Sequence, residues 1–175
     1  VGNFVFDGNP LYNPNSLDIG AGIGNTVTVT TKQGTADYWA QFYGDVTENN
    51  YTDGQSTIFD STGNVYVTGT NSNPDLGHDQ AFLRKLTTTG SVIWEVATPI
   101  TSPNADITHT SGESLALDNS GNLYWLTNVW GNSASGWQVT KVEPATGSAI
   151  WNTQETVDSD SAMDLTVLSN GTIAV

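Results

Sequence analysis

The fold of this chain is decided by the stretch Asp118-Asn-Ser-Gly-Asn-Leu-Tyr-Trp-Leu-Thr127, because related sequence occurs at two other places. The first is Asp60-Ser-Thr-Gly-Asn-Val-Tyr-Val-Thr-Gly69, and a weaker third is Leu168-Ser-Asn-Gly-Thr-Ile-Ala-Val175. In each copy a glycine-centred turn separates two apolar runs, which is the pattern of a β-hairpin. Because glycine adopts positive φ without steric cost, Gly63 and Gly121 are expected to form the turns.

A second block of sequence repeats with nearly the same period. Phe82-Leu-Arg-Lys-Leu-Thr-Thr-Thr-Gly-Ser-Val-Ile-Trp94 is matched by Trp137-Gln-Val-Thr-Lys-Val-Glu-Pro-Ala-Thr-Gly-Ser-Ala-Ile-Trp151. Trp39 stands 55 residues before Trp94 and resembles the end of a unit whose beginning is missing or replaced. Repeats of this length predict a repeat architecture. The matched positions, 56 to 58 residues apart, are Asp60 with Asp118, Gly63 with Gly121, Lys85 with Lys141, and Trp94 with Trp151.

Each full unit contains four short apolar runs, which we expect to form four antiparallel strands. The first and last links are tight glycine turns, whereas the middle links, Thr70 to Asp79 and Trp130 to Ser135, are longer and polar. No stretch after residue 38 has the apolar period and caps of a helix, so almost no helix is expected. The expected strands are 55–59, 65–69, 80–86 and 91–96 in the first unit, and 113–117, 123–129, 136–142 and 148–152 in the second.

The expected fold class is all-β, with four-stranded antiparallel blades of a partial β-propeller after a small N-terminal β-element. Strands that are apolar on both faces, such as Leu123 to Leu126, have to be covered on both sides. A propeller needs about four to eight such sheets around an axis. Two full units cannot close that ring, so we expect a larger chain, an assembly of copies or an open stack. Both ends of the sequence resemble cuts in a longer polypeptide, which favours the first.

The repeat also sets the expected domain boundaries. Residues before it contain a short apolar run, Phe4-Val-Phe6, and an alternating stretch, 25–31, which we expect to be strands of the N-terminal element. The expected boundaries are 1–36 for the N-terminal element and 37–175 for the partial propeller, with an outer strand at about 38–46, blades at about 53–98 and 111–155, and the start of a third blade at 160–175.

The repeated residues resemble a known family, the SBBP-type β-propeller repeat. The resemblance rests on Asp-x-x-Gly-Asn-x-Tyr-x-Thr-Gly, Ala-Phe-Leu-x-Lys-Leu and Gly-Ser-x-x-Trp, and covers about residues 38–175. The second copy departs from it at Thr127-Asn128, and the third lacks the Asp and the Tyr. The family is known from bacterial extracellular proteins and from structural proteins of tailed phages. The stretch 3–11 is similar to short β-elements of marine phage virion proteins, so the resemblance implies an extracellular or virion location.

The charge of the chain is strongly acidic, with 18 acidic residues, four basic ones and a formal net charge of −14. Four basic residues cannot form the patch that nucleic-acid phosphates or anionic membranes require. The chain has no cysteine, which excludes disulfides and thiolate metal sites. It also has no apolar run long enough for a membrane-spanning helix. An acidic surface rich in Thr, Ser, Asn and Gly is common among secreted and particle-exposed β-proteins.

Acidic residues supply the candidate metal ligands. Asp60 and Asp118 open the hairpin turns and could bind calcium, but the spacing of calcium-loop acids is absent. Capping of the turn by the Asp itself is therefore favoured. Asp158, Asp160 and Asp164 form a denser stretch that could hold a cation, although a solvated loop before the third unit is favoured. No cofactor is expected.

Lys85 and Lys141 occupy the same repeat position between apolar residues. Each is expected to lay its aliphatic stem along the sheet and to direct its ammonium group to a carboxylate. We predict that the two lysines pair with acidic residues of an adjacent strand, for which Asp60 and Asp118 are the candidates.

The tryptophans suggest two roles. Trp94 and Trp151 recur at a fixed position, which favours packing between blades over a sugar-binding platform. Trp130 lies in a polar middle link and is the best candidate for an exposed contact residue. The other candidate interaction residues are Trp137, His78 and Asp75.

No catalytic constellation is apparent, so the chain is predicted not to be an enzyme. His78 and His109 lie in different links without a metal-binding spacing, and no Ser–His–carboxylate set can be identified. One motif keeps an enzymatic alternative open. Thr146-Gly-Ser-Ala-Ile-Trp151 resembles the docking motif of quinoprotein dehydrogenase propellers, which implies a fragment of a calcium- and quinone-dependent enzyme.

The expected function is that of a non-enzymatic structural or interaction module in a larger extracellular or virion protein. A phage tail, fibre or baseplate-associated component is preferred. Its partners would be other structural proteins or further copies of itself, contacted through the links 70–79 and 128–136. The alternative is a secreted bacterial propeller that binds a glycan or a peptide. Nucleic-acid binding and membrane insertion are not expected.

Overall fold

The computed structural model describes the strands Val5–Phe6, Thr28–Gln33 and Ala36–Gln41 and the residues 51–73, 78–98, 107–131, 135–155 and 161–175. These parts of the chain contain thirteen strands and no helix, so the all-β prediction is confirmed for them. Accordingly, none of the described residues forms a helix able to cross a membrane.

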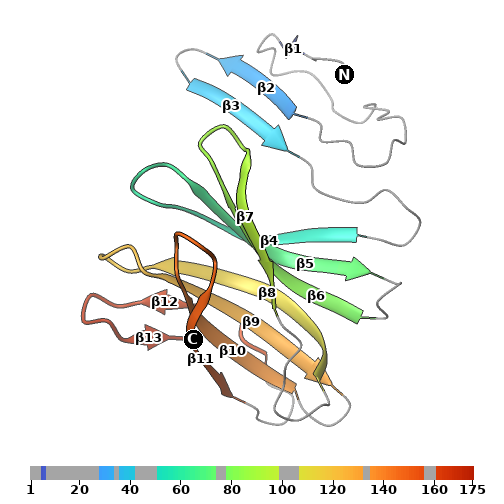
Figure 1. The fold of residues 1–175 in the computed structure, drawn as a ribbon, viewed down its shortest axis with the longest axis vertical. Helices are drawn as coiled ribbons and strands as arrows, with labels where there is room; N and C mark the ends of the chain where they lie inside the picture. Colours follow the sequence, from blue (N-terminus) through green and yellow to red (C-terminus); the bar gives the residue numbers. More distant parts are fainter. Residues whose placement is uncertain are drawn as a thin grey trace.

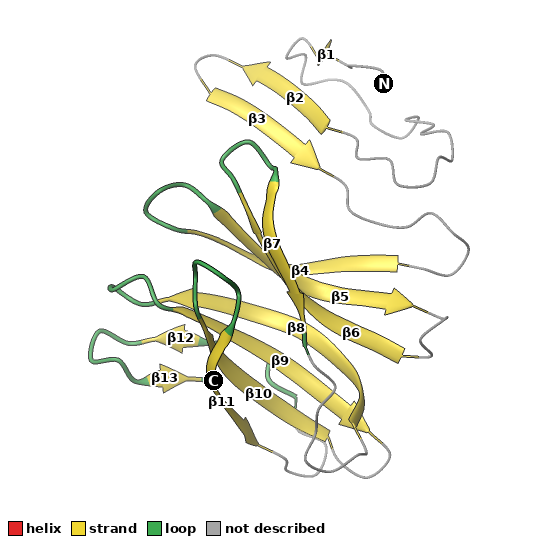
Figure 2. Cartoon of the chain, in the orientation of Figure 1, coloured by secondary structure: helices red, strands yellow, loops and turns green. Residues whose placement is uncertain are grey.

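Two four-stranded antiparallel sheets form the centre of the molecule (Figures 1 and 2). In both, strands that follow one another in the chain are neighbours in the sheet. This is the predicted order for each unit. The strands are β4 Tyr51–Phe59, β5 Val65–Asn73, β6 His78–Leu86 and β7 Val92–Ala97 in the first sheet, and β8 Ile107–Leu117, β9 Leu123–Gly131, β10 Ser135–Val142 and β11 Ala149–Glu155 in the second.

In the loops predicted at 70–79 and 128–136, each described residue lies in a strand. β5 continues to Asn73 before β6 begins at His78, and β9 continues to Gly131. The two connections are therefore shorter than predicted, and their central residues, 74–77 and 132–134, lie outside the described residues. The sequence pattern did not indicate these strand ends because their side chains are polar. The hydrogen bonds between strands are made by backbone groups and need no apolar residue.

A short hairpin and a separate sheet complete the described elements. β12 (Thr166–Val167) pairs antiparallel with β13 (Ile173–Ala174), and the turn and second strand of this hairpin come from the third copy of the repeat. The strands β1 (Val5–Phe6), β2 (Thr28–Gln33) and β3 (Ala36–Gln41) form a three-stranded sheet in that order. β3 includes position 39, so the strand expected to belong to the repeats is paired with the N-terminal element.

The first turn of every copy has the same backbone hydrogen bonds. The glycine has positive φ in each, and its N–H donates to the residue three positions earlier. The third copy keeps this turn although a leucine replaces the Asp, and there the Asn170 side chain accepts a hydrogen bond from the Thr172 N–H. The three bonds are Gly63 to Asp60 (3.0 Å, φ 86°), Gly121 to Asp118 (2.9 Å, φ 80°) and Gly171 to Leu168 (2.8 Å, φ 83°).

The two large sheets stack face to face and enclose the first core cluster (Figure 1). Neighbouring residues of β9 point to opposite faces, as alternation along a strand requires. Trp125 packs in the cluster that contains Tyr66 of the first sheet. Tyr124 faces the other way and packs in a second cluster with Leu165, next to the third hairpin. β9 is therefore buried on both faces, as its continuous apolar sequence predicts.

Close polar contacts hold β8 against the first sheet. A Cβ atom at Gly112 would overlap the hydroxyl of Thr68, so only glycine fits at this crossing. Trp125 Nε1 donates to Thr68 Oγ1 at 2.7 Å, and Thr70 Oγ1 donates to Ser111 Oγ at 2.8 Å. Because these groups are buried or partly buried, their hydrogen bonds fix how the sheets are placed on one another.

Candidate functional site

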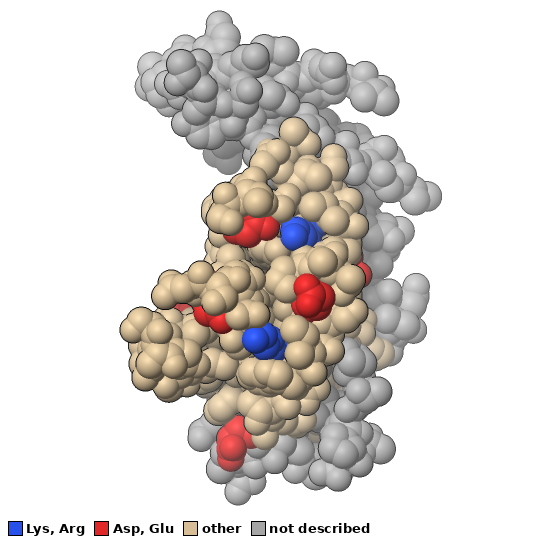
Figure 3. All heavy atoms as spheres, turned by 60° about the vertical axis from the view of Figure 1, so that its left-hand side comes forward, with Lys and Arg blue, Asp and Glu red and all other residues tan. Residues whose placement is uncertain are grey.

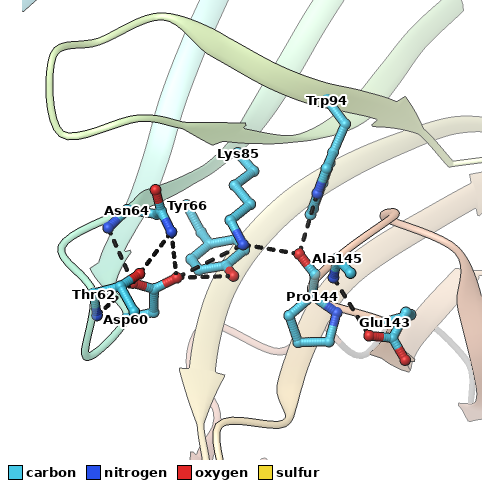
Figure 4. Close-up of polar contacts among 9 residues, drawn as sticks. All are labelled: Asp60, Thr62, Asn64, Tyr66, Lys85, Trp94, Glu143, Pro144 and Ala145. Carbon is cyan, nitrogen blue, oxygen red and sulfur yellow. Dashed lines mark hydrogen bonds and ion pairs between the residues drawn. The ribbon is translucent and has the colours of Figure 1, made fainter.

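Asp60 follows β4 and organises the turn into β5. Its Oδ1 accepts hydrogen bonds from the backbone N–H groups of Thr62 (2.9 Å) and Asn64 (3.0 Å) and from the Thr62 hydroxyl (2.6 Å). Its Oδ2 accepts hydrogen bonds from Asn64 Nδ2 (3.0 Å) and from the Tyr66 hydroxyl (3.3 Å) (Figure 4). The hypothesis that the Asp caps its own turn is confirmed.

Asp118 repeats this arrangement in the second sheet. Its Oδ1 accepts from the backbone N–H groups of Ser120 and Asn122, both at 2.9 Å. Its Oδ2 accepts from Asn122 Nδ2 (2.6 Å) and from the Tyr124 hydroxyl (3.2 Å). Both carboxylates thus accept hydrogen bonds from donor groups of their own hairpins.

The hydrogen bonds lower the pKa of both carboxyl groups because they stabilise the charged form. Burial acts to raise the pKa of Asp60, but the hydrogen bonds from Thr62 and Asn64 outweigh it and hold the pKa well below its usual range. The amide of Asn122 is the main cause of the lowered pKa of Asp118. Both groups are therefore ionised at neutral pH.

Tyr66 gathers three other repeat residues on the face of the first sheet that is turned to the second (Figure 4). Lys85 Nζ lies 4.9 Å from the centroid of the Tyr66 ring and 3.7 Å from Asp60 Oδ2. The Trp94 ring lies 6.0 Å from the Tyr66 ring, tilted by 55°. Burial raises the pKa of the Tyr66 hydroxyl, which keeps it protonated as a donor. We call Asp60, Tyr66, Lys85 and Trp94 the first quartet.

The first quartet binds the main chain of the second sheet. Lys85 Nζ and Trp94 Nε1 both donate to the carbonyl oxygen of Pro144, at 3.0 and 3.2 Å (Figure 4). Pro144 belongs to the turn between β10 and β11, as does Gly147. A Cβ atom on Gly147 would lie 2.9 Å from Trp94 Cε3, and its φ is 78°. The turn therefore fits over the indole because this residue is glycine.

A second quartet of Asp118, Tyr124, Lys141 and Trp151 has nearly the same geometry. Lys141 Nζ lies 5.6 Å from the centroid of the Tyr124 ring. The Trp151 ring lies 6.1 Å from the Tyr124 ring, tilted by 56°. Within the described residues, Lys141 Nζ and Trp151 Nε1 have no hydrogen-bond partner, and Trp151 is 40% exposed.

The predicted lysine pairings have different outcomes in the two sheets. Lys85 forms the predicted ion pair with Asp60. Lys141 forms no ion pair with Asp118 in the described parts of the chain, so that prediction is wrong. The Lys141 ammonium lies instead over the Tyr124 ring, 5.6 Å from its centroid.

The candidate cation ligands are only partly described. Asp158 and Asp160 lie outside the described residues. Asp164 accepts hydrogen bonds from the Ser114 hydroxyl (2.6 Å) and the Leu165 N–H (2.8 Å), and so connects β8 to the third hairpin. The described ranges contain no group of three His, Asp or Glu residues able to hold a metal ion.

The described candidate interaction residues are distributed over both large sheets. Trp137 is half-buried and packs against the second core cluster. Trp130 is half-buried near the end of β9, and His78 begins β6 in the other sheet. Asp75 lies outside the described residues. Trp94 packs between the sheets as predicted, whereas Trp125, which had no predicted role, is buried there.

Pro144 is the functional residue that sequence reasoning missed. Its contribution is a main-chain carbonyl, which every residue possesses, so residue type gives no signal. The spacing does carry one: Lys141 is separated from Gly147 by one residue more than Lys85 is from Gly90. This longer turn presents its carbonyl to the preceding sheet.

The described surface is acidic and has no basic patch. Figure 3 shows Lys and Arg side chains as isolated groups near acidic ones. Arg84 is paired with Glu95 at 2.7 Å, and Lys85 is engaged in the first quartet. This distribution offers no run of cations for a phosphate backbone.

A cavity of about 260 Å³ lies between β7 and the outer strands of the second sheet. Trp125 and Val142 contribute apolar surface to its lining, and Gln138, Thr140 and Asn152 contribute polar groups.

Comparison of the chain with models of protein families gives no match, and comparison with curated proteins gives none either. The SBBP-type resemblance therefore stays a prediction from the repeated residues.

Proposed function

We propose that the chain is a non-enzymatic structural and interaction module, formed by stacked blades of a β-propeller, in a larger extracellular or virion protein. A phage tail, fibre or baseplate-associated component is the preferred setting. The observation that carries this proposal is the recurrent quartet, which in its first copy binds the Pro144 carbonyl of the next sheet. A link from each sheet to the next builds a stack, as the blades of a propeller require.

Composition and charge support a scaffold exposed to the exterior. The net charge of −14 favours solubility and disfavours nucleic-acid binding. The Asp and Lys residues of the first quartet stabilise a turn and an inter-sheet contact, which are structural roles. Its partners would be other structural proteins or further copies of the chain.

Fractionation of the source culture tests this function. Cells, soluble supernatant and density-gradient particles would be separated, and peptides from residues 51–175 quantified by mass spectrometry. A virion component is expected to sediment with the particles at a fixed ratio to their major structural protein. Enrichment in the soluble supernatant would instead support a secreted protein, and enrichment inside cells would contradict both settings.

The cavity between the sheets supports a second candidate function, glycan or peptide binding. A pocket with a mainly apolar lining and a few amide and hydroxyl groups suits a small ligand such as a sugar ring. Saturation-transfer NMR with a panel of monosaccharides is expected to give signals that Gln138→Ala reduces. A panel that gives no signal at millimolar sugar would remove this candidate.

A further inference from the structure

The second quartet has the donors of a carbonyl-binding site. In the first quartet an ammonium group and an indole N–H converge on one oxygen, that of Pro144. In the second, Lys141 and Trp151 hold the same positions beside Tyr124. The indole of Trp151 is 40% exposed, and no described residue accepts a hydrogen bond from either group.

From this we infer that Lys141 and Trp151 form a docking site for the outer β-hairpin of a further repeat unit, whose turn presents a main-chain carbonyl as Pro144 does. The inference rests on the proposed structural function and names its partner. The first quartet shows what kind of segment would bind, because its Lys85 and Trp94 already bind the turn of the hairpin β10–β11. Its turn needs a glycine at the position of Gly147, because a side chain there would meet the indole ring.

The hairpin β12–β13 indicates where the docking hairpin would pair. β12 and β13 already occupy the place of the first two strands of a third sheet, and their turn matches that of Asp118 to Asn122. Gly171 corresponds to Gly121, so Val175 stands at the position of Trp125. The outer edge of β13 is therefore where the third strand of that sheet would pair, just as β10 pairs with β9. A hairpin on that edge would place its turn over Lys141 and Trp151.

A neutral carbonyl suits the site better than a carboxylate does. Asp118 already supplies one negative charge beside Tyr124, and a carboxylate ligand would also approach a chain of net charge −14. A main-chain carbonyl can accept from both donors without this repulsion, as in the first quartet.

Titration of a hairpin probe into the intact chain tests the inference. The probe is a synthetic peptide of residues 137–155, cyclised through a D-Pro-Gly turn because Trp137 and Glu155 are paired at its open end. The chain carries ¹⁵N-labelled tryptophan. The indole N–H signal of Trp151 is expected to shift and to exchange more slowly with solvent, while that of Trp94 stays unchanged.

Variants assign the binding to the two donors. Lys141→Met and Trp151→Phe each remove one hydrogen bond, so calorimetry is expected to show about tenfold weaker binding for each. Ile93→Ala, a loss of exposed apolar surface on the first sheet, is the matched control and is expected to leave the affinity unchanged. A probe with an ester in place of the amide after its Pro144 has a weaker carbonyl acceptor and is expected to bind less tightly.

Three results would overturn the inference. They are the absence of a Trp151 shift at millimolar probe, binding that survives both donor variants, and acetate producing the same shift, which would make the site a carboxylate site. Fractionation tests the proposed function, and titration tests the docking site, so each can fail without the other. A chain found inside cells could still bind the probe, and a virion chain could fail to bind it.

Discussion

The two quartets have the same aromatic geometry and different neighbours. The Tyr–Trp centroid distances are 6.0 and 6.1 Å, and the interplanar angles are 55° and 56°. The Pro144 carbonyl lies across the first quartet, and no described acceptor lies across the second. Since the rings hold the same arrangement in both, the sheet itself sets them. Such preorganisation lowers the ordering cost of docking.

The lysine is where the two quartets differ. Lys85 Nζ lies 4.9 Å from its tyrosine ring and forms an ion pair with Asp60. Lys141 Nζ lies 5.6 Å from its tyrosine ring and forms no such pair within the described residues. The position of the lysine side chain therefore depends on whether a carbonyl such as that of Pro144 is bound, whereas the Tyr and Trp rings keep the same arrangement. The four predictions below test this contrast in order of expected effect.

The largest difference is expected between Trp94→Ala and Trp151→Ala. Trp94 packs between the sheets and donates to Pro144, so its loss should lower the free energy of unfolding by about 2–4 kcal/mol. Trp151 is 40% exposed, and its loss should cost about 1 kcal/mol or less. Urea unfolding measures both. Equal losses would show that the contact with the second sheet contributes little.

The glycines of two turns give the next contrast. Gly147→Ala places a Cβ atom 2.9 Å from Trp94, whereas Gly121→Ala meets nothing within 4 Å. Both glycines have positive φ, so each substitution costs about 1–2 kcal/mol for the backbone. Gly147→Ala is expected to cost about 1–3 kcal/mol more through overpacking. Thermal unfolding of the two variants is the measurement, and the same cost for both would contradict the close fit of the turn over the indole.

The sheets were predictable from the sequence because their signal is repeated. The turn glycines, the apolar runs of β9 and the period between matching residues all indicate the same four-stranded unit. The strand ends were missed because the polar residues there are paired by their backbone groups, as in Asn71 with Gln80. Composition carries little information about such pairs.

The candidate site was predictable only in its side chains. The repeated Lys and Trp positions were identified, and one lysine pairing was predicted correctly. The acceptor that joins them to the next sheet is a backbone carbonyl, and its position depends on how two sheets stack. That arrangement is a tertiary property with no local sequence signal beyond the extra residue in the turn before Gly147.

The lysines test the contact itself. Lys85→Met removes a hydrogen bond to Pro144 and the partner of Asp60, and is expected to lower the free energy of unfolding by about 1–2 kcal/mol. Lys141→Met should change it by about 0.5 kcal/mol at most. Double-mutant cycles with Asp60→Asn and Asp118→Asn separate the ion pair from the packing. We expect coupling of about 0.5–1 kcal/mol for the first pair and close to zero for the second.

The smallest expected difference is in how Asp60 and Asp118 affect the free energy of unfolding at acidic pH. Both Asp60 and Asp118 have a pKa below 3.8, the ordinary value of an aspartate carboxyl group, so each stabilises the fold above that pH. This contribution is lost as the pH falls through 3.8 towards the folded-state pKa, because the unfolded chain then binds more protons. Urea unfolding between about pH 5 and pH 2.5 should therefore show stability decreasing with acidity.

The two carboxylates should contribute unequally to that slope. The Thr62 hydroxyl donates to Asp60, and the pKa of Asp60 is the more strongly lowered of the two. Asp60→Asn should flatten the acid dependence more than Asp118→Asn, and Thr62→Val, which removes a donor to Asp60, should move the wild-type curve towards that of Asp60→Asn. All three variants keep the turn glycines, so the fold itself should persist at neutral pH. Curves that stay parallel to the wild type would show that the turn carboxylates are hydrogen-bonded equally in the unfolded chain, and that the Asp serves the turn without stabilising it.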